Sequence, residues 1–216
     1  MKIVIQCAGR KFENAGRLTT FSGEKVLFVA HPEKYTGWDK CCRPDSIRDG
    51  TDGTWREYLK SYNQQGSDPN NLFPAGDLYK PSIYKALVEK YDAENVFILS
   101  AGWGLIRSDF LIPLYDITFS NQGEPYSKRG PRDQFEDFNQ LSEGSILPDE
   151  TIYFFGGQAY LPLYCNLTKN ITARKVIYHS QGDAYQIQGY ECIHFGNYTN
   201  WHYVCAQNFI DDKIQK

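Results

Sequence analysis

The sequence predicts a single α/β domain in which helices flank a mostly parallel central sheet, with a segment inserted after the first strand. Short apolar runs rich in β-branched and aromatic residues end at glycines or polar residues, as buried strands do. Helical patterns alternate with these runs along the second half of the chain, which is typical of parallel sheets. A chain of 216 residues is long enough to bury a core without a metal or a disulfide.

The first strand is expected at Lys2–Gln6, and it ends in a glycine turn that holds Cys7, Arg10 and Lys11. A strand followed by a glycine and two cations predicts contact with a phosphate, and a tight turn with solvated charges is the alternative. Arg10 and Lys11 are therefore phosphate-binding candidates. Cys7 is either a nucleophile or a small buried thiol, and the buried thiol is the commoner case.

Residues 12–71 are expected to form the insertion, which either covers the site or sets its specificity. They include a second strand at Val26–Ala30, a turn-rich stretch, and a helix that begins near Thr54. On this helix, large apolar side chains recur at positions i, i+3, i+4 and i+7. Such an aromatic stripe favours packing in the core over binding a ligand.

The second half of the chain alternates helices and strands. Proline is tolerated in the first turn of a helix, so a helix is expected over Pro81–Tyr91, before a central strand at Val96–Leu99. A further helix is expected around Asp133–Leu141, then strands at Thr151–Phe155 and Lys175–His179. If these strands are parallel, their carboxyl ends lie along one edge of the sheet, where α/β folds bind ligands.

The stretch Val96–Asp116 carries the clearest pattern of a binding site. Its apolar strand opens abruptly into small residues around one tryptophan, and a second apolar run ends in a tyrosine and an aspartate. Small residues let the backbone approach a ligand closely, and flat rings beside a carboxylate suit a nucleobase or a sugar. The strand ends are expected to gather Cys7, Ser100, Gly156, Gly157 and His179 around Asp116.

This stretch resembles the signature of the YaaA-like proteins, which reads I-L-S-A-x-x-G-L-[ILV] followed by P-Y-D. Two flanking elements, Asp77–Tyr79 and Phe155–Tyr160, resemble the family's A-x-D-L-Y and G-G-x-x-Y patterns. The resemblance spans about residues 72–165 and the first strand, with an extra Leu114 inside P-Y-D. The signature matches at Ile98, Leu99, Ser100, Ala101, Gly104, Leu105, Ile106, Pro113, Tyr115 and Asp116.

What the resemblance implies is a connection with nucleic acid. The YaaA-like family includes a DNA-binding protein of the peroxide-stress response, and its members also occur in pathways that handle modified 7-deazaguanine bases in DNA. The partner expected from the resemblance is therefore DNA or a nucleotide-type substrate.

A polar stretch over residues 117–132 is the best candidate for holding a nucleic-acid backbone. It contains Lys128, Arg129 and Arg132 together with a tyrosine, a glycine and a proline, and a solvated surface loop is the alternative. The formal net charge of −3 and the pI near 5.8 argue against a protein that coats nucleic acid indiscriminately.

The first function compatible with these residues is an N-glycosidase, most concretely a DNA glycosylase that excises a modified base. Asp116 would stabilise the oxocarbenium-like transition state or orient water, and a turn or helix cap is its alternative role. Ser100 and Tyr115 are the other catalytic candidates. The candidates for binding the base are Trp103, Tyr79, Gly102, Gly104, Gly156 and Gly157.

Two other functions stay open. One is a stress-response protein that binds DNA without turnover, and the other is a hydrolase of an amide or nitrile on a modified base, with Cys7 or Ser100 as nucleophile. A Ser-His-Asp hydrolase can be written from Ser100, His179 and Asp116, but the sequence lacks a G-x-S-x-G elbow. It also lacks the fingerprints of P-loop kinases and Rossmann dehydrogenases.

No cofactor or metal is expected. The six cysteines form no C-x-x-C pair, and Cys41, Cys42 and His31 are the nearest approach to a zinc site. The amino terminus lacks the features of a signal peptide, and no apolar run reaches the about 18 residues of a membrane helix. We therefore expect a cytoplasmic monomer without a membrane partner.

Overall fold

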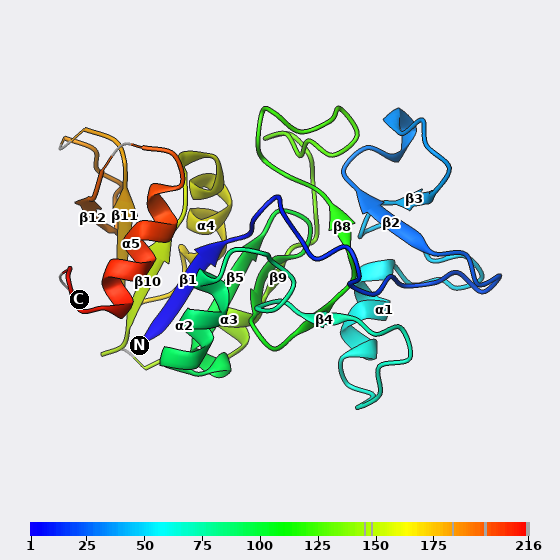
Figure 1. The fold of residues 1–216 in the computed structure, drawn as a ribbon, viewed down its shortest axis with the longest axis horizontal. Helices are drawn as coiled ribbons and strands as arrows, with labels where there is room; N and C mark the ends of the chain where they lie inside the picture. Colours follow the sequence, from blue (N-terminus) through cyan, green and yellow to red (C-terminus); the bar gives the residue numbers. More distant parts are fainter. Residues whose placement is uncertain (145, 148, 183, 197, 215–216) are drawn as a thin grey trace.

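In the computed structural model, a sheet of seven strands has the order β12-β11-β10-β1-β5-β6-β9 (Figure 1). The structure describes residues 1–144, 146–147, 149–182, 184–196 and 198–214. The strands from β12 to β5 are parallel, and this arrangement confirms the predicted fold class. These strands are β1 (Lys2–Gln6), β5 (Val96–Ser100), β10 (Thr151–Phe155), β11 (Arg174–His179) and β12 (Glu191–His194).

The sheet continues beyond β5 through a tight hairpin. Strand β6 (Gly104–Arg107) folds back antiparallel on β5, and β9 (Phe138–Asn139) pairs in parallel with β6. Gly104 begins β6 with a φ of +88°, and a Cβ built there would lie 2.5 Å from the carbonyl oxygen of Phe138. Only glycine meets both constraints without a shift of the backbone.

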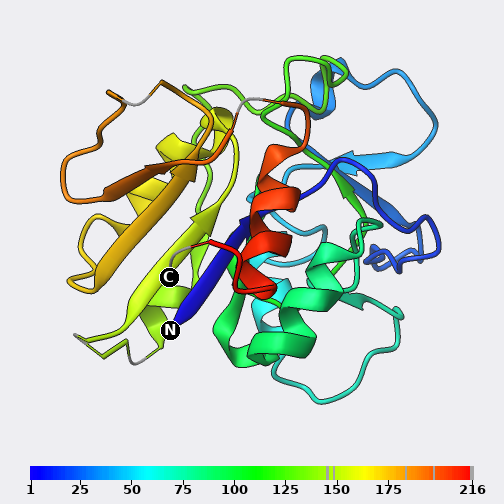
Figure 2. The ribbon, with the colours of Figure 1, turned by 60° about the vertical axis from the view of Figure 1, so that its left-hand side comes forward.

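Helices cover both faces of the sheet. Helices α2 (Ile83–Tyr91) and α5 (Trp201–Ile210) lie side by side over one face, whereas α4 (Leu161–Thr168) and the short α3 (Gln140–Glu143) lie on the other (Figures 1 and 2). Among the described residues, no helix is both long enough and apolar enough to cross a membrane.

The insertion builds a second, smaller sheet beside the first (Figure 1). Strand β2 (Val26–Val29) is its centre, with β3 (Lys40–Cys42) on one side and β8 (Tyr115–Asp116) on the other, all parallel. Helix α1 (Trp55–Tyr62) begins at Thr54, which forms a capping box with Glu57. The remaining short elements are β4 (Phe73–Pro74), β7 (Leu111–Ile112), η1 (Pro32–Lys34), η2 (Ala93–Asn95) and η3 (Gln158–Tyr160).

The predicted helix around Asp133–Leu141 is wrong, because residues 133–137 have no regular structure and Phe138–Asn139 is a strand. Tertiary contacts hold this segment extended. The Asp133 carboxylate accepts a hydrogen bond from the Gly130 N–H at 2.6 Å, and the Phe138 N–H donates to the Trp103 carbonyl at 3.0 Å. Helix α3 begins only at Gln140, so Gln140 and Leu141 are the residues of the predicted range that are helical.

Candidate functional site

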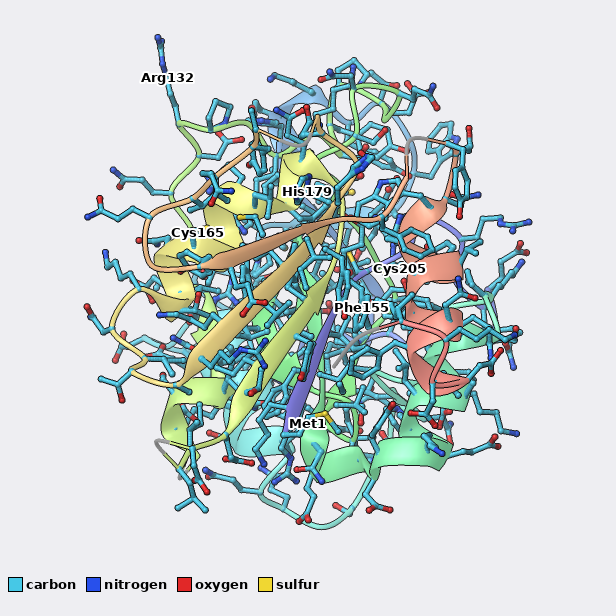
Figure 3. The ribbon with its side chains drawn as sticks, turned by 90° about the vertical axis from the view of Figure 1, so that its left-hand side faces the viewer. Met1, Arg132, Phe155, Cys165, His179 and Cys205 are labelled. Atoms are coloured by element: carbon cyan, nitrogen blue, oxygen red, sulfur yellow. The ribbon has the colours of Figure 1, made fainter. Side chains whose placement is uncertain are left out.

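The candidate site lies where β10, β1 and β5 end side by side. Cys7 follows β1, Ser100 ends β5, and Gly156 follows β10, as expected from parallel strands. The Cys7 N–H donates to the Leu99 carbonyl at 3.0 Å, so the end of β1 is tied to its neighbour. Figure 3 shows His179 and Arg132 toward this end of the sheet and Met1 at the opposite end.

Buried hydroxyl groups link the ends of these strands. The Ser100 hydroxyl donates to the Tyr115 hydroxyl at 2.9 Å, and the hydroxyls of Tyr115 and Tyr79 are 2.9 Å apart. The Cys7 thiol lies 3.2 Å from the Tyr160 hydroxyl. Burial raises the pKa of Tyr79, Tyr115 and Tyr160 well above the usual range. All three phenols therefore stay protonated at neutral pH and hold the network by hydrogen bonds.

Lys11 lies beside this network of hydroxyl groups. Its Nζ is 4.2 Å from the centroid of the Tyr115 ring, and its charge interacts with those of Cys7 and Asp116. Burial lowers the pKa of Lys11, an effect that Cys7 and Asp116 oppose. Lys11 and Asp116 are both half-buried residues.

Asp116 is fixed by backbone and side-chain contacts. It lies in β8, where it pairs with Val29 of the insertion, and its carboxylate interacts with the Tyr126 hydroxyl. Burial and the negative charge of Asp116 raise the pKa of Tyr126 to about 12. The Tyr126 carbonyl accepts the His31 N–H at 2.8 Å, so this tyrosine is tied to the insertion as well.

Two buried arginines hold the turn between β5 and β6. Arg129 donates to the Ala101 carbonyl at 2.9 Å, and Arg56 donates to the carbonyls of Gly102 and Trp103 at 3.0 and 3.1 Å. On the other side of the turn, the N–H groups of Gly102 and Trp103 lie 3.3 and 3.1 Å from the Ser100 hydroxyl oxygen that accepts them. Polar partners thus hold both sides of the turn in place.

The rings predicted to stack on a base lie in the core. Trp103 has an exposed fraction of 0% and packs 5.1 Å from Phe28 and 6.5 Å from Phe138. Tyr79 is also buried, 4.8 Å from the ring of Tyr84. The faces of both rings are therefore covered by protein, and the structure provides no open stacking platform at Trp103 or Tyr79.

The glycines predicted to bind the base are constrained mainly by packing and by backbone hydrogen bonds. A Cβ on Gly102 would lie 3.1 Å from the side chain of Tyr115, and one on Gly156 would lie 2.3 Å from the Phe154 ring. The Gly157 N–H donates to the Gln6 side-chain oxygen at 2.6 Å. Gly104 serves the hairpin described above.

The phosphate-binding candidates separate into exposed and buried groups. Arg129 is only 8% exposed and forms a two-pronged ion pair with Asp137 at 2.8 and 2.6 Å, so its guanidinium does not face solvent. Arg10 and Arg132 are exposed, and Lys128 is half-buried. The expectation that Arg129 holds a phosphate does not fit its placement.

A groove of about 900 Å³ runs beside the candidate site. We call it the cationic groove. Phe119 lies on its wall, and the Phe119 ring is 5.0 Å from the Tyr160 ring, which in turn contacts Cys7. The groove therefore adjoins the strand ends. Its lining includes His31, Lys34, Phe119, Lys128, Arg132 and Leu163.

His179 does not join Ser100 and Asp116. Strand β11, which it ends, is separated from β5 by β10 and β1, and the His179 ring contacts those of Tyr185 and His194. The Ser100 hydroxyl instead donates to Tyr115. The Ser-His-Asp arrangement is not assembled in this structure.

The cysteines proposed as the nucleus of a zinc site lie in β3. Burial, with a contribution from Asp39, raises the pKa of the Cys41 thiol to about 11, and burial also raises the pKa of Cys42. Protonated thiols are poor metal ligands at neutral pH. Within the described part of the chain, no group of at least three His, Cys, Asp or Glu side chains is placed to hold a metal ion.

Gln6 and His202 also border the site, and no sequence motif marks either of them. The Gln6 side chain bridges from Gly157 to His202, whose Nε2 lies 3.1 Å from its amide nitrogen. Burial lowers the pKa of His202 to about 4, so the ring is neutral at physiological pH.

At this edge of the site, a half-buried aspartate and a half-buried lysine lie beside buried hydroxyls and a thiol. Such a set can stabilise positive charge, orient water or attack an electrophilic carbon. No protein-family model matches the chain, and no curated protein is significantly similar to it.

Proposed function

We propose that the protein is an N-glycosidase that removes a modified base from DNA, with Asp116 as its essential carboxylate. The observation that carries the proposal is the placement of Asp116. It is fixed by β2 and Tyr126 at the carboxyl edge of a parallel sheet, half-buried, beside Lys11 and close to the cationic groove.

A fixed carboxylate suits the cleavage of an N-glycosidic bond. The bond from C1′ to the base nitrogen breaks with its electron pair leaving on the base, and positive charge develops on the sugar. Asp116 stabilises that charge or orients the water that attacks C1′, and partial burial strengthens the interaction relative to bulk water. Protonation of the departing base completes the reaction.

The cationic groove is suited to the DNA backbone. Exposed Lys34 and Arg132 and half-buried Lys128 line it, and Figure 3 shows Arg132 extending away from the body of the protein. These cations can hold phosphates while a base is turned out of the stack. Phe119, half-buried on the groove wall, is the aromatic ring that the base can reach.

The resemblance to YaaA-like proteins agrees with this proposal. Two groups of signature residues, Ser100–Gly104 and Tyr115–Asp116, come together at this edge through the hydrogen bond between Ser100 and Tyr115. A nucleic-acid substrate is what the resemblance implies for them.

The second candidate is a protein that binds DNA without turnover. The burial of Ser100, Tyr79 and Tyr115 favours it, because these side chains reach a ligand only if the site opens, whereas the groove cations need no such change. The third candidate, a hydrolase that uses Cys7 or Ser100, requires a buried nucleophile to become accessible.

The test is incubation of the purified protein with ordinary DNA and with hypermodified phage DNA, followed by alkali to reveal abasic sites. Asp116→Asn is the test variant, and Asp211→Asn, which alters an exposed aspartate after α5 that pairs with Lys213, is the matched control. Strand breaks with wild type and Asp211→Asn but not with Asp116→Asn support the glycosidase. Intact DNA throughout, with a salt-sensitive mobility shift, supports the binding protein.

A further inference from the structure

The backbone of Lys11 is held on both sides. Lys11 forms an antiparallel bridge with Tyr79, the Phe12 N–H donates to the Leu78 carbonyl at 3.0 Å, and the Lys80 N–H donates to the Arg10 carbonyl at 3.1 Å. This anchoring fixes where the side chain starts. The Nζ atom then reaches the ring of Tyr115, the residue that precedes Asp116.

The surroundings of Lys11 differ from those of the other cations at this edge. Arg10 and Arg132 point to solvent, as binding a phosphate requires, whereas the Lys11 ammonium rests on a buried aromatic ring. Burial lowers its pKa, which increases the share of neutral amine, the form that attacks carbon. Lys11 as a residue is only half-buried, so part of its side chain remains open to a substrate.

We propose that Lys11 is a nucleophilic amine that forms an imine with C1′ of an abasic deoxyribose and cleaves the DNA strand at that site. The inference takes its substrate from the proposed function, since an abasic sugar is the product of base excision.

The chemistry needs no co-reactant beyond water. The amine adds to the C1′ aldehyde and water leaves, which gives a protonated imine. Loss of the C2′ proton to a base lets the C3′–O bond break, and the 3′ phosphate departs with the electron pair. Water then hydrolyses the imine, returning the amine and releasing an unsaturated aldehyde. Asp116, whose charge acts on Lys11, is the nearby carboxylate that can take the C2′ proton.

The amino terminus, the other amine that forms such imines, is remote from the site. Met1 precedes β1, whereas Lys11 comes after it, so Met1 lies at the opposite end of the sheet (Figure 3). Its ammonium group is paired with Glu150 at 2.7 Å.

The experiment uses an oligonucleotide that carries one preformed abasic site, incubated with the full-length protein and sodium borohydride. Reduction of the imine leaves a covalent adduct, which a denaturing gel detects and peptide mass spectrometry assigns to a residue. We expect an adduct with wild type, located on Lys11, and none with Lys11→Met or Lys11→Arg. The arginine variant keeps the positive charge but cannot form the imine. Lys80→Met, which removes an exposed lysine from the neighbouring segment, is the matched control and should form the adduct as wild type does.

No adduct with wild type, or an adduct located on Met1 or another lysine, would overturn the proposal. Because mass spectrometry locates the adduct in the wild-type protein, the role of Lys11 is tested even if a Lys11 variant fails to fold. Because the abasic site is preformed, the outcome is separate from base excision. An adduct on Lys11 without excision contradicts only the glycosidase, and excision without an adduct contradicts only the role of Lys11.

Discussion

The side chains of Gln6 and His202 meet at the carboxyl edge of the sheet, with the glutamine amide nitrogen 3.1 Å from Nε2 of the histidine. Gln6 uses its oxygen to accept the Gly157 N–H, so its amide group is free to donate to the ring. Nε2 of His202 must then be an unprotonated acceptor. If Nε2 carried a proton, it would face the N–H of the Gln6 amide, and two donors would meet inside a buried site.

We therefore expect His202 to make the folded state sensitive to acid. Burial lowers its pKa from 6.5 to about 4, so the unfolded chain binds a proton more readily than the folded one. The contribution of His202 to stability is complete above pH 6.5 and is lost as the pH falls toward 4, in total about 3 kcal/mol. Urea unfolding at pH 7 and pH 4.5 measures this loss. His202→Asn should lose clearly less stability over the same interval, and equal losses in the two proteins would contradict the assignment.

Arg129 should matter for stability. Removing its guanidinium with Arg129→Met leaves the carboxylate of Asp137 buried and unpaired, and we expect a loss of about 3–5 kcal/mol in the free energy of unfolding. The double variant Arg129→Met, Asp137→Leu should recover part of that loss, because no buried charge remains. If Arg129→Met unfolds at the same urea concentration as wild type, the buried ion pair is unimportant.

In contrast to Arg129, Lys128 and Arg132 should matter for DNA binding and hardly for stability. Both line the cationic groove, and their replacement by alanine leaves the core untouched. We expect each substitution to reduce the salt dependence of DNA binding by about one unit in the slope of log K against log salt, with little change in stability. Fluorescence anisotropy with a labelled duplex at several salt concentrations measures the slope. Lys169→Ala is an exposed control on the segment after α4, outside the groove, and an equal effect there would rule out a specific contribution from the groove.

Gly104 and Gly66 allow the turn after β5 to be tested with matched substitutions. Both have positive φ, +88° and +67°, but a Cβ at Gly66 meets nothing within 4 Å, whereas one at Gly104 meets the Phe138 carbonyl. Gly66→Ala should cost about 1–2 kcal/mol from backbone conformation alone. Gly104→Ala should cost clearly more, because the junction between β6 and β9 must also shift. Thermal unfolding of the two variants compares these costs, and equal values would show that the close approach to Phe138 is relieved easily.

The sequence predicted β1, β5, β10 and β11 of the main sheet because each has a short apolar run that a glycine or polar residue ends, whereas β6, β9 and β12 were missed because they carry no such run. The shared edge followed, since parallel strands must place their carboxyl ends together. Helix α5 was missed because apolar and polar residues occur on all its sides, so no stripe marks it. The role of Trp103 was also hidden, since a ring in the core and a ring that stacks on a base look the same in a sequence.

The two buried arginines, Arg129 and Arg56, show a different limit of prediction from the sequence. Arg129 stands in a polar, cationic stretch, and nothing local distinguishes it from Lys128. Its partner Asp137 lies in a segment whose pattern suggested a helix, and only the tertiary contacts that keep this segment extended place the two charges together. Arg56 lies on a helix whose pattern marks only its apolar stripe, although this arginine binds the backbone 46 and 47 residues later in the chain.

The contacts of Arg56 determine whether residues 12–71 can be removed from the chain. Helix α1 belongs to residues 12–71, yet its arginine supplies the donors for the carbonyls of Gly102 and Trp103, and β2 is the strand with which β8, the strand of Asp116, pairs. Excising residues 12–71 would leave the turn after β5 with unsatisfied carbonyls and β8 without a neighbour. The segment is thus an integral part of the scaffold, and it cannot be grafted or exchanged as a separate module. Insertion and sheet should melt in a single cooperative transition.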